Sequence, residues 1–312
     1  MRRVPGCGTA AVVDASYHGR VSDTGELSTT VARLAAGTVE YRLDRRGDRV
    51  VVVMHGAHMR AGLTLDESAY ADADLTVLAP SRPGYGRTPT STGTTPAGFA
   101  DVVADLCRRL GIDRVAAVVG ISAGGRSAMA LAARHPDLVE RLILQTAQAP
   151  LKWPTRGTRL LAGLLFPPAT ERLTWGGIRW LLRRSPDSGL RMLFGGLSTM
   201  PPRQVVARLG PEQRAALVAL FSRMRSGSGF RNDVRPGPDV SAEIGQPTLV
   251  IATRRDGAVP FGHAEHLVRA IRRAELVESQ SDSHFAEFGA DWPAVSGAIG
   301  AFLDAGPSPG RT

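Results

Sequence analysis

The chain has 312 residues, of which 43% are apolar and 21% are charged. This composition lies near the globular average and excludes a largely disordered protein, and the length suffices for one large domain or two smaller ones. The formal net charge is +9 at pH 7, and Lys152 is the only lysine, so nearly all the positive charge is arginine. Because GC-rich coding can produce such a bias without selection for phosphate contacts, we expect no nucleic-acid partner.

Cysteine usage and hydropathy indicate a protein of the cytoplasm. Cys7 and Cys107 lie far apart and form no C-x-x-C pair, which predicts neither a structural disulfide nor a zinc site. The N-terminal region contains Arg2 and Arg3 but no apolar run of the length that a signal peptide needs. No stretch reaches 18 consecutive apolar residues, so we expect no integral membrane segment.

The first elements in chain order are a leader and a hairpin. Residues 1–26 show no sustained hydrophobic period and predict a flexible leader, as residues 306–312 predict a tail. Two short alternating runs, Thr30–Leu34 and Thr38–Leu43, are separated by Gly37. They predict an antiparallel hairpin.

From residue 50 onward, buried strands alternate with helical patterns, which is typical of a mostly parallel sheet covered on both faces. The predicted strands are Val50–Met54, Leu75–Ala79, Val115–Val119, Leu142–Gln145 and Thr248–Ala252, with a last one near Leu276–Ser279. The predicted helices span about Pro96–Leu110, Ala123–Arg134, Gly262–Arg272 and Pro293–Leu303.

Residues 149–240 interrupt this alternation and are too long for a loop. Their helix-forming and proline-broken sequence predicts a helical insertion over the C-terminal edge of the sheet, where ligands bind in open α/β folds. Basic residues exceed acidic ones there by more than the net charge of the whole chain. Arginines such as Arg179, Arg183 and Arg184 are candidates for contact with a substrate carboxylate or an anionic surface, although a solvated helix face is an equally simple interpretation.

The strongest motif is Gly120-Ile121-Ser122-Ala123-Gly124-Gly125, a G-x-S-x-G sequence that lies between a predicted strand and a predicted helix. A nucleophilic serine at such a tight turn needs small flanking residues. The turn also places the amide of Ala123 at a helix N-terminus, where it can stabilise an oxyanion. A glycine-rich turn without chemistry is the alternative.

In these motifs the chain resembles the α/β-hydrolase family, in particular its capped members, over residues 30–305. His55-Gly56-Ala57 follows a strand as the family's H-G-x element does, which implies the Ala57 amide as second oxyanion donor. Ser81-Arg82-Pro83-Gly84-Tyr85-Gly86 is similar to the family's P-G-x-G turn, with serine in place of the usual aspartate. The resemblance implies a mostly parallel eight-stranded sheet flanked by helices, with a core over 27–148 and 241–305 and a helical cap over 149–240, inserted after the sixth strand.

A serine hydroxyl needs a histidine base and a carboxylate that orients the histidine. Asp256 follows the strand Thr248–Ala252, where the family keeps its acid, whereas the alternative position at Gln145–Gln148 offers no carboxylate. His284 follows the last strand and resembles the family's catalytic histidine. We therefore predict a triad of Ser122, His284 and Asp256, with a solvated loop aspartate as the simpler interpretation of Asp256.

The other histidines suggest supporting roles. His55 is predicted to brace the oxyanion loop and His58 to contact substrate. His263 and His266 are predicted to lie on one face of a helix and not to bind a metal, because no H-E-x-x-H or paired-carboxylate motif accompanies them. Gly120–Gly125 lacks the ending of a phosphate-binding loop. We expect neither a metal nor a cofactor.

The serine nucleophile disfavours epoxide opening and halide displacement, for which relatives use an aspartate. We predict a carboxylesterase acting on a small to medium apolar or aromatic ester through an acyl-enzyme, with Trp153 and Trp180 among the substrate contacts. The open alternatives are carbon–carbon or amide hydrolysis, cofactor-free perhydrolysis, a degenerate ligand-binding module, and a peripheral binder of anionic surfaces. The sequence does not predict the oligomeric state.

Overall fold

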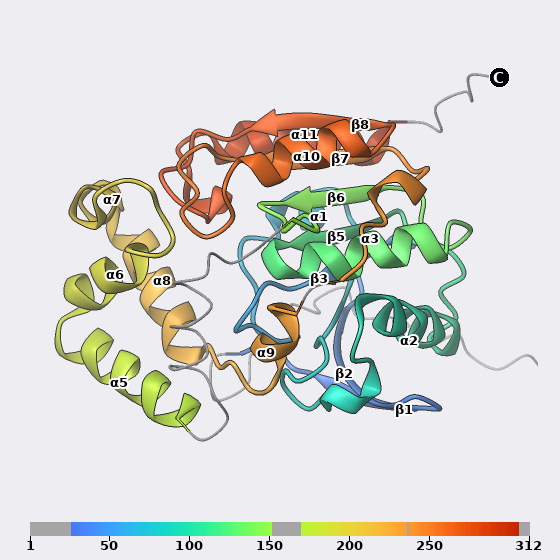
Figure 1. The fold of residues 1–312 in the computed structure, drawn as a ribbon, viewed down its shortest axis with the longest axis horizontal. Coiled ribbons are helices and arrows are strands. Elements are labelled where there is room, and N and C mark those ends of the chain that lie inside the picture. Colours follow the sequence, from blue (N-terminus) through green and yellow to red (C-terminus); the bar gives the residue numbers. More distant parts are fainter. Residues whose placement is uncertain (1–25, 152–169, 236, 306–312) are drawn as a thin grey trace, which may run out of the picture.

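The computed structural model describes residues 26–151, 170–235 and 237–305. Its centre is an eight-stranded sheet in the order β1-β2-β4-β3-β5-β6-β7-β8 (Figure 1). All neighbouring strands are parallel except the pairs β1–β2 and β2–β4, which confirms the predicted sheet. The strands are β1 Thr30–Leu34, β2 Gly37–Asp44, β3 Val50–Met54, β4 Thr76–Pro80, β5 Ala117–Ile121, β6 Leu142–Gln145, β7 Thr248–Ala252 and β8 Ala274–Glu278.

The predicted hairpin is formed by β1 and β2, which pair from Thr30 opposite Tyr41 to Leu34 opposite Gly37. Gly37 has a φ of 131°, a conformation that side chains with a Cβ rarely adopt. The second strand begins at this glycine, one residue before the predicted start.

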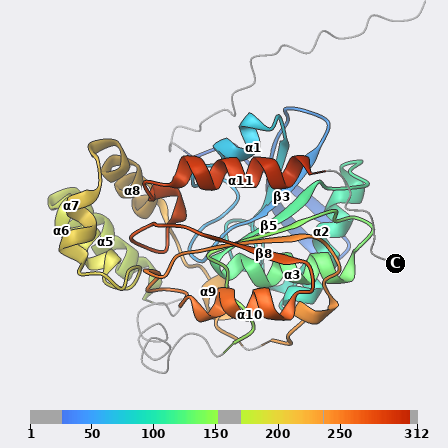
Figure 2. The same cartoon turned by 90° about the horizontal axis from the view of Figure 1, so that it is seen from above.

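Two hydrophobic cores cover the two faces of the sheet. Alternate residues of β3 belong to different cores: Val52 packs with α2, α3 and α10, whereas Val51 and Val53 pack with α1 and α11. Figure 2 shows these helices on opposite sides of the strands. The helices are α1 Ser68–Asp72, α2 Pro96–Arg109, α3 Gly125–Arg134, α10 Gly262–Ala270 and α11 Trp292–Asp304.

Some helices and strands begin at residues other than the predicted ones. The strand predicted at Val115 begins at Ala117, because Val115 forms only an isolated bridge to Val139. The following helix begins at Gly125, after a 3-10 turn η2 over Ser122–Gly124. The five-residue helix α1 was not predicted because it is too short to show a helical period.

Between β6 and β7 the chain forms helices α5 Glu171–Arg184, α6 Pro186–Phe194, α7 Pro202–Arg208, α8 Pro211–Arg223 and α9 Gly229–Asp233. Three of them have proline in the first turn, where its missing N–H costs nothing. Figure 1 shows α5 to α8 beside the end of the sheet toward which β6 and β8 point. We call residues 170–235 the helical insertion.

The helical insertion has a core of its own, built from residues such as Trp175, Leu182 and Phe194. Met59, Leu63 and Phe285 of the sheet domain join this core, so the insertion is packed onto the sheet domain. None of the helices in the described ranges is long and apolar enough to cross a membrane. The predicted leader lies outside the described residues except for Glu26, and the predicted tail lies outside them altogether.

Candidate active site

Ser122 occupies a sharp turn between β5 and α3. Its φ of 52° lies in the left-handed region, which is strained for a residue other than glycine. A Cβ on Gly120 would lie 2.6 Å from the Cα of Gly125, and a Cβ on Gly124 would lie 2.1 Å from the carbonyl oxygen of Met54. The two glycines of the G-x-S-x-G motif are therefore required by close backbone approach on both sides of the serine.

Asp256 and His284 form a buried pair. The Nδ1 atom of His284 lies 2.6 Å from Oδ2 of Asp256, and both side chains are almost fully enclosed. The other carboxylate oxygen of Asp256 accepts the amides of Ala258 at 2.7 Å and Val259 at 2.8 Å. These bonds fix the carboxylate, which in turn fixes the orientation of the imidazole ring.

Burial alone would lower the pKa of His284, because it penalises the charged ring. The charge of Asp256 and its hydrogen bond outweigh burial, and the pKa of His284 is raised overall. A ring of this kind is a stronger proton acceptor than an ordinary histidine.

Ser122 and His284 both line a cavity of about 530 Å³ beneath the helical insertion. No hydrogen bond joins the side chains of Ser122 and His284 in this structure. Such bonds are often long or unformed without substrate. The carbonyl of Ser122 accepts the amide of Gln148 at 2.9 Å, which holds the turn itself in place.

The predicted oxyanion donors lie on either side of Ser122. A Cβ on Gly56 would be 3.4 Å from the Cβ of Ser122, so the loop after β3 passes directly over the serine, and Ala57 in this loop lines the cavity. Ala123 follows Ser122 at the start of the 3-10 turn. Ala57 therefore lines the same cavity as Ser122, and Ala123 is the next residue in the chain; their role as oxyanion donors remains a proposal.

His55 braces this loop from behind. Its Nδ1 lies 2.7 Å from the carbonyl of Gly56, and its Nε2 accepts the amide of Arg82 at 2.9 Å. Burial and the charge of Arg82 hold its pKa well below the ordinary value. His55 is therefore a neutral structural group and not a base.

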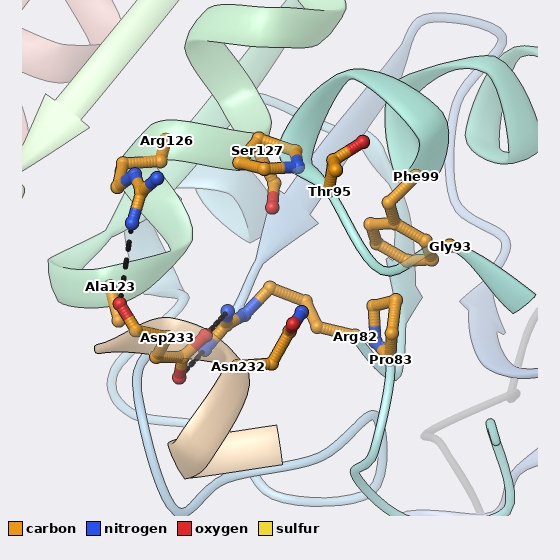
Figure 3. Close-up of a pocket in the computed structure, with 11 residues that line it drawn as sticks. Arg82, Pro83, Gly93, Thr95, Phe99, Ala123, Arg126, Ser127, Asn232 and Asp233 are labelled. Atoms are coloured by element: carbon orange, nitrogen blue, oxygen red, sulfur yellow. Dashed lines mark hydrogen bonds and ion pairs between the residues drawn. The ribbon is translucent and has the colours of Figure 1, made fainter. Parts of the chain in front are cut away.

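Arg82 extends this brace toward the helical insertion. Its guanidinium makes a buried two-pronged contact with Asp233 of α9, and the hydroxyl of Tyr85 donates to the same carboxylate at 2.6 Å. Figure 3 shows Arg82 and Asp233 beside a cavity of only about 20 Å³, which is the size of a single water. This small cavity is separate from the one that contains Ser122.

Ser81 occupies the position of the family's usual aspartate. Its hydroxyl donates to Glu40 at 2.8 Å and accepts the amide of Ala61 at 2.9 Å. The serine therefore still organises the turn.

The predicted substrate contacts fall in three different places. His58 lines the cavity, with Nδ1 2.8 Å from the hydroxyl of Ser226, and burial lowers its pKa to about 4. Trp153 lies outside the described residues. The prediction for Trp180 is wrong: its side chain is 62% exposed and is not part of the cavity wall.

Trp175 takes the place that was expected for Trp180. It lies five residues earlier on α5, so the two side chains point to different faces of the helix. Trp175 is buried in the cavity wall and donates from its indole nitrogen to Ser226 at 2.9 Å.

Two cavity residues were not anticipated by the motif analysis. His263 is buried and lines the cavity, and its Nδ1 accepts the amide of Ala149 at 3.1 Å, which leaves Nε2 as the protonated nitrogen. Glu287 also lines the cavity, three residues after His284. The helical period identifies a buried face for His263, but no signal in the sequence distinguishes Glu287.

His266, the other half of the dismissed metal pair, lies on the exposed side of α10 at 3.0 Å from Asp239. In the part of the chain that the structure describes, no group of three or more histidine, cysteine, aspartate or glutamate side chains is arranged to hold a metal ion.

Comparisons with known proteins agree with this architecture. A family model described as the alpha/beta hydrolase fold matches residues 50–290. An uncharacterized hydrolase of Bacillus subtilis is 31% identical over 274 residues, which cover 86% of this chain and 95% of that protein. A 2-hydroxy-6-oxononadienedioate/2-hydroxy-6-oxononatrienedioate hydrolase of Paraburkholderia phymatum is 32% identical over 268 residues, 80% of this chain and 85% of that protein.

Among solved structures, an alpha/beta hydrolase fold protein from Nakamurella multipartita matches with a TM-score of 0.74 and 26% identity, covering 88% of this chain and 99% of that one. The chain belongs to the α/β-hydrolase-fold family and is a hydrolase.

Proposed function

We propose that this hydrolase cleaves carboxylic esters with a small to medium apolar acyl group or an aromatic group. The observation that carries the proposal is that Ser122 and the Asp256–His284 pair meet at one cavity whose remaining wall is largely apolar. Apolar wall residues include Met59, Leu65, Ile121, Trp175, Ile178, Leu193, Leu197, Phe221, Met224, Phe230 and Phe285.

The reaction follows from the roles of the three side chains. The hydroxyl oxygen of Ser122 attacks the ester carbonyl carbon, and its proton passes to Nε2 of His284, while Asp256 stabilises the charged ring. The amides of Ala57 and Ala123 stabilise the oxyanion. The alcohol leaves with the proton from His284, and an acyl group remains on Ser122. A water molecule then attacks the acyl group and gives a proton to His284. The bond between the acyl carbon and the Ser122 oxygen breaks, His284 returns the proton to that oxygen, and the acid is released.

We further propose that the helical insertion acts as a cap. It supplies wall residues such as Trp175, Phe221 and Met224, which line the same cavity as Ser122. An apolar cap removes water around the ester and strengthens the interactions of the oxyanion donors.

Carbon–carbon bond hydrolysis is the second candidate, because the relative from Paraburkholderia phymatum is named for a 2-hydroxy-6-oxo dioate substrate and is matched over 85% of its length. The same nucleophile and base would serve both reactions. The two candidates differ in the charge that the cavity must accept.

The test is a series of p-nitrophenyl esters of increasing chain length, assayed beside a 2-hydroxy-6-oxo dienoic acid. We expect turnover of the esters, and we expect a fluorophosphonate to label Ser122. The variant Ser122→Ala should lose both properties, whereas Ser91→Ala, which changes an exposed serine, should keep them. Equal turnover by the wild type and Ser122→Ala would instead indicate a binding module.

A further inference from the structure

The described part of the cavity wall carries few charged groups. Its polar side chains are His58, Ser122, Thr146, His263, His284 and Glu287, and neither an arginine nor a lysine is among the described residues that line it. Burial lowers the pKa values of His58 and His263, so both are uncharged near neutral pH. Glu287 is thus the carboxylate that a bound substrate faces, together with the base His284.

Glu287 carries out no step of the reaction described above, although its charge adds to the raised pKa of His284. It lies in the 3-10 turn η4, Ala286–Phe288, and is 8% exposed. Gln145, the last residue of β6, donates from its side-chain amide to Oε1 of Glu287. Because this hydrogen-bond partner is an amide and not a cation, it does not neutralise the negative charge of Glu287 when the carboxyl group is ionised.

The titratable groups around Glu287 are His284, Asp66 before α1, and Tyr70 on α1. Burial raises the pKa of Glu287 to about 7, and Asp66 adds to this rise, while the charge of His284 and the amide of Gln145 act in the opposite direction. The carboxylate of Asp66 accepts a hydrogen bond from the indole nitrogen of Trp292 at 2.8 Å. Glu287 is therefore neutral at acid pH and carries its charge above about pH 7.

We propose that Glu287 determines substrate charge: it excludes esters that bear a carboxylate, so that the enzyme acts on uncharged esters. This inference rests on the proposed ester hydrolysis. A substrate carboxylate in this cavity would lose its hydration, meet the charge of Glu287 and find no cationic side chain among the described wall residues. An uncharged ester meets none of these penalties.

The same reasoning disfavours the second candidate function. A dioate carries two carboxylates, and burying them beside the charge of Glu287 without a cationic partner costs free energy. No arginine of the described part of the insertion is among the residues that line the cavity. Three of them, Arg208, Arg214 and Arg225, pair instead with Asp282, Asp187 and Glu171 respectively.

The experiment compares two esters of equal length, the mono-p-nitrophenyl ester of suberic acid and the same compound with its free carboxylate methylated. Release of p-nitrophenol gives kcat/KM for each. Both esters depend on His284 in the same way, so the titration of the base cancels in the ratio of the two kcat/KM values. We expect the wild type to prefer the methylated ester and the preference to grow as the pH rises through about 7, where Glu287 ionises.

The variant Glu287→Gln removes the charge and keeps an oxygen that can accept the amide of Gln145. It should reduce the preference roughly tenfold above neutral pH and abolish the pH dependence of the ratio. The matched control is Glu212→Gln, which removes an exposed carboxylate of α8 and should leave the ratio unchanged. A ratio that is independent of pH in the wild type, or equal in wild type and Glu287→Gln, would overturn the proposal.

A binding measurement separates this proposal from the proposed reaction. In Ser122→Ala, calorimetric titration with monomethyl suberate and with dimethyl suberate reports affinity without turnover. Glu287→Gln in that background should bring the two affinities roughly tenfold closer above neutral pH. If neither p-nitrophenyl ester is hydrolysed, ester hydrolysis fails, and the affinity ratio still decides whether Glu287 selects against carboxylates.

Discussion

The carbonyl of Leu197, in the helical insertion, accepts the amide of His284, the proposed base, at 2.8 Å. The same carbonyl accepts the amide of Gly257, next to the proposed acid Asp256, at 3.3 Å. Ser198 adds a bridge to Asp256 and donates its hydroxyl to the carbonyl of Asp282. One segment of the insertion therefore joins the loop of Asp256 to the loop of His284, so the insertion supports the proposed catalytic pair and also forms part of the cavity wall.

Removal of the Ser198 hydroxyl should weaken the connection between the helical insertion and the loop that carries His284. Ser198→Ala loses the contact with Asp282 and the bond that the hydroxyl accepts from the amide of Met200 at 3.0 Å. Each such bond contributes about 1 kcal/mol, so we expect kcat to fall about fivefold with little change in KM. Steady-state kinetics on a p-nitrophenyl ester measures the effect. Ser222→Ala on α8 is the control, and equal kinetics for the two variants would contradict a positioning role.

Asp256→Asn tests the orientation of the base. The amide fills the same space but no longer carries the charge that favours the correct tautomer of His284, and kcat should fall by about 10³ to 10⁴. Because Asp256 also raises the pKa of His284, the residual activity should persist to lower pH than the activity of the wild type. The pH profile of kcat/KM shows this shift. An acid limb that stays in place would exclude Asp256 as the partner of the base.

Gly124→Ala tests the packing behind the nucleophile. The new Cβ would lie 2.1 Å from the carbonyl oxygen of Met54, so the turn must shift and we expect a loss of stability of about 1–3 kcal/mol together with most of the activity. Gly177→Ala is the matched control, since a Cβ there meets nothing within 4 Å on α5. That change should be neutral or stabilise the helix by up to about 1 kcal/mol. Urea unfolding compares the two variants, and similar midpoints would refute the packing argument.

The sequence by itself predicted the sheet and the elbow, and the family resemblance singled out the three candidate catalytic side chains. Buried strands have a distinctive apolar run, and the G-x-S-x-G motif can be recognised because its residues are contiguous in the chain, although Gly124 is required by a contact with Met54 of β3. The order of Ser122, Asp256 and His284 follows from the order of the strands that carry them. Their placement at one edge is therefore a property of the topology, which the hydrophobic pattern predicts.

Only the tertiary structure decided what surrounds these side chains. Trp180 and Trp175 lie on one amphipathic helix, and the face that turns toward the cavity depends on how the insertion packs, so the sequence analysis chose the wrong tryptophan. Glu287 contacts Gln145, and Leu197 contacts His284. In each pair the two residues lie more than 80 positions apart in the chain. Such long-range contacts leave no periodic trace in the chain, because they arise from the meeting of loops after the elements have folded.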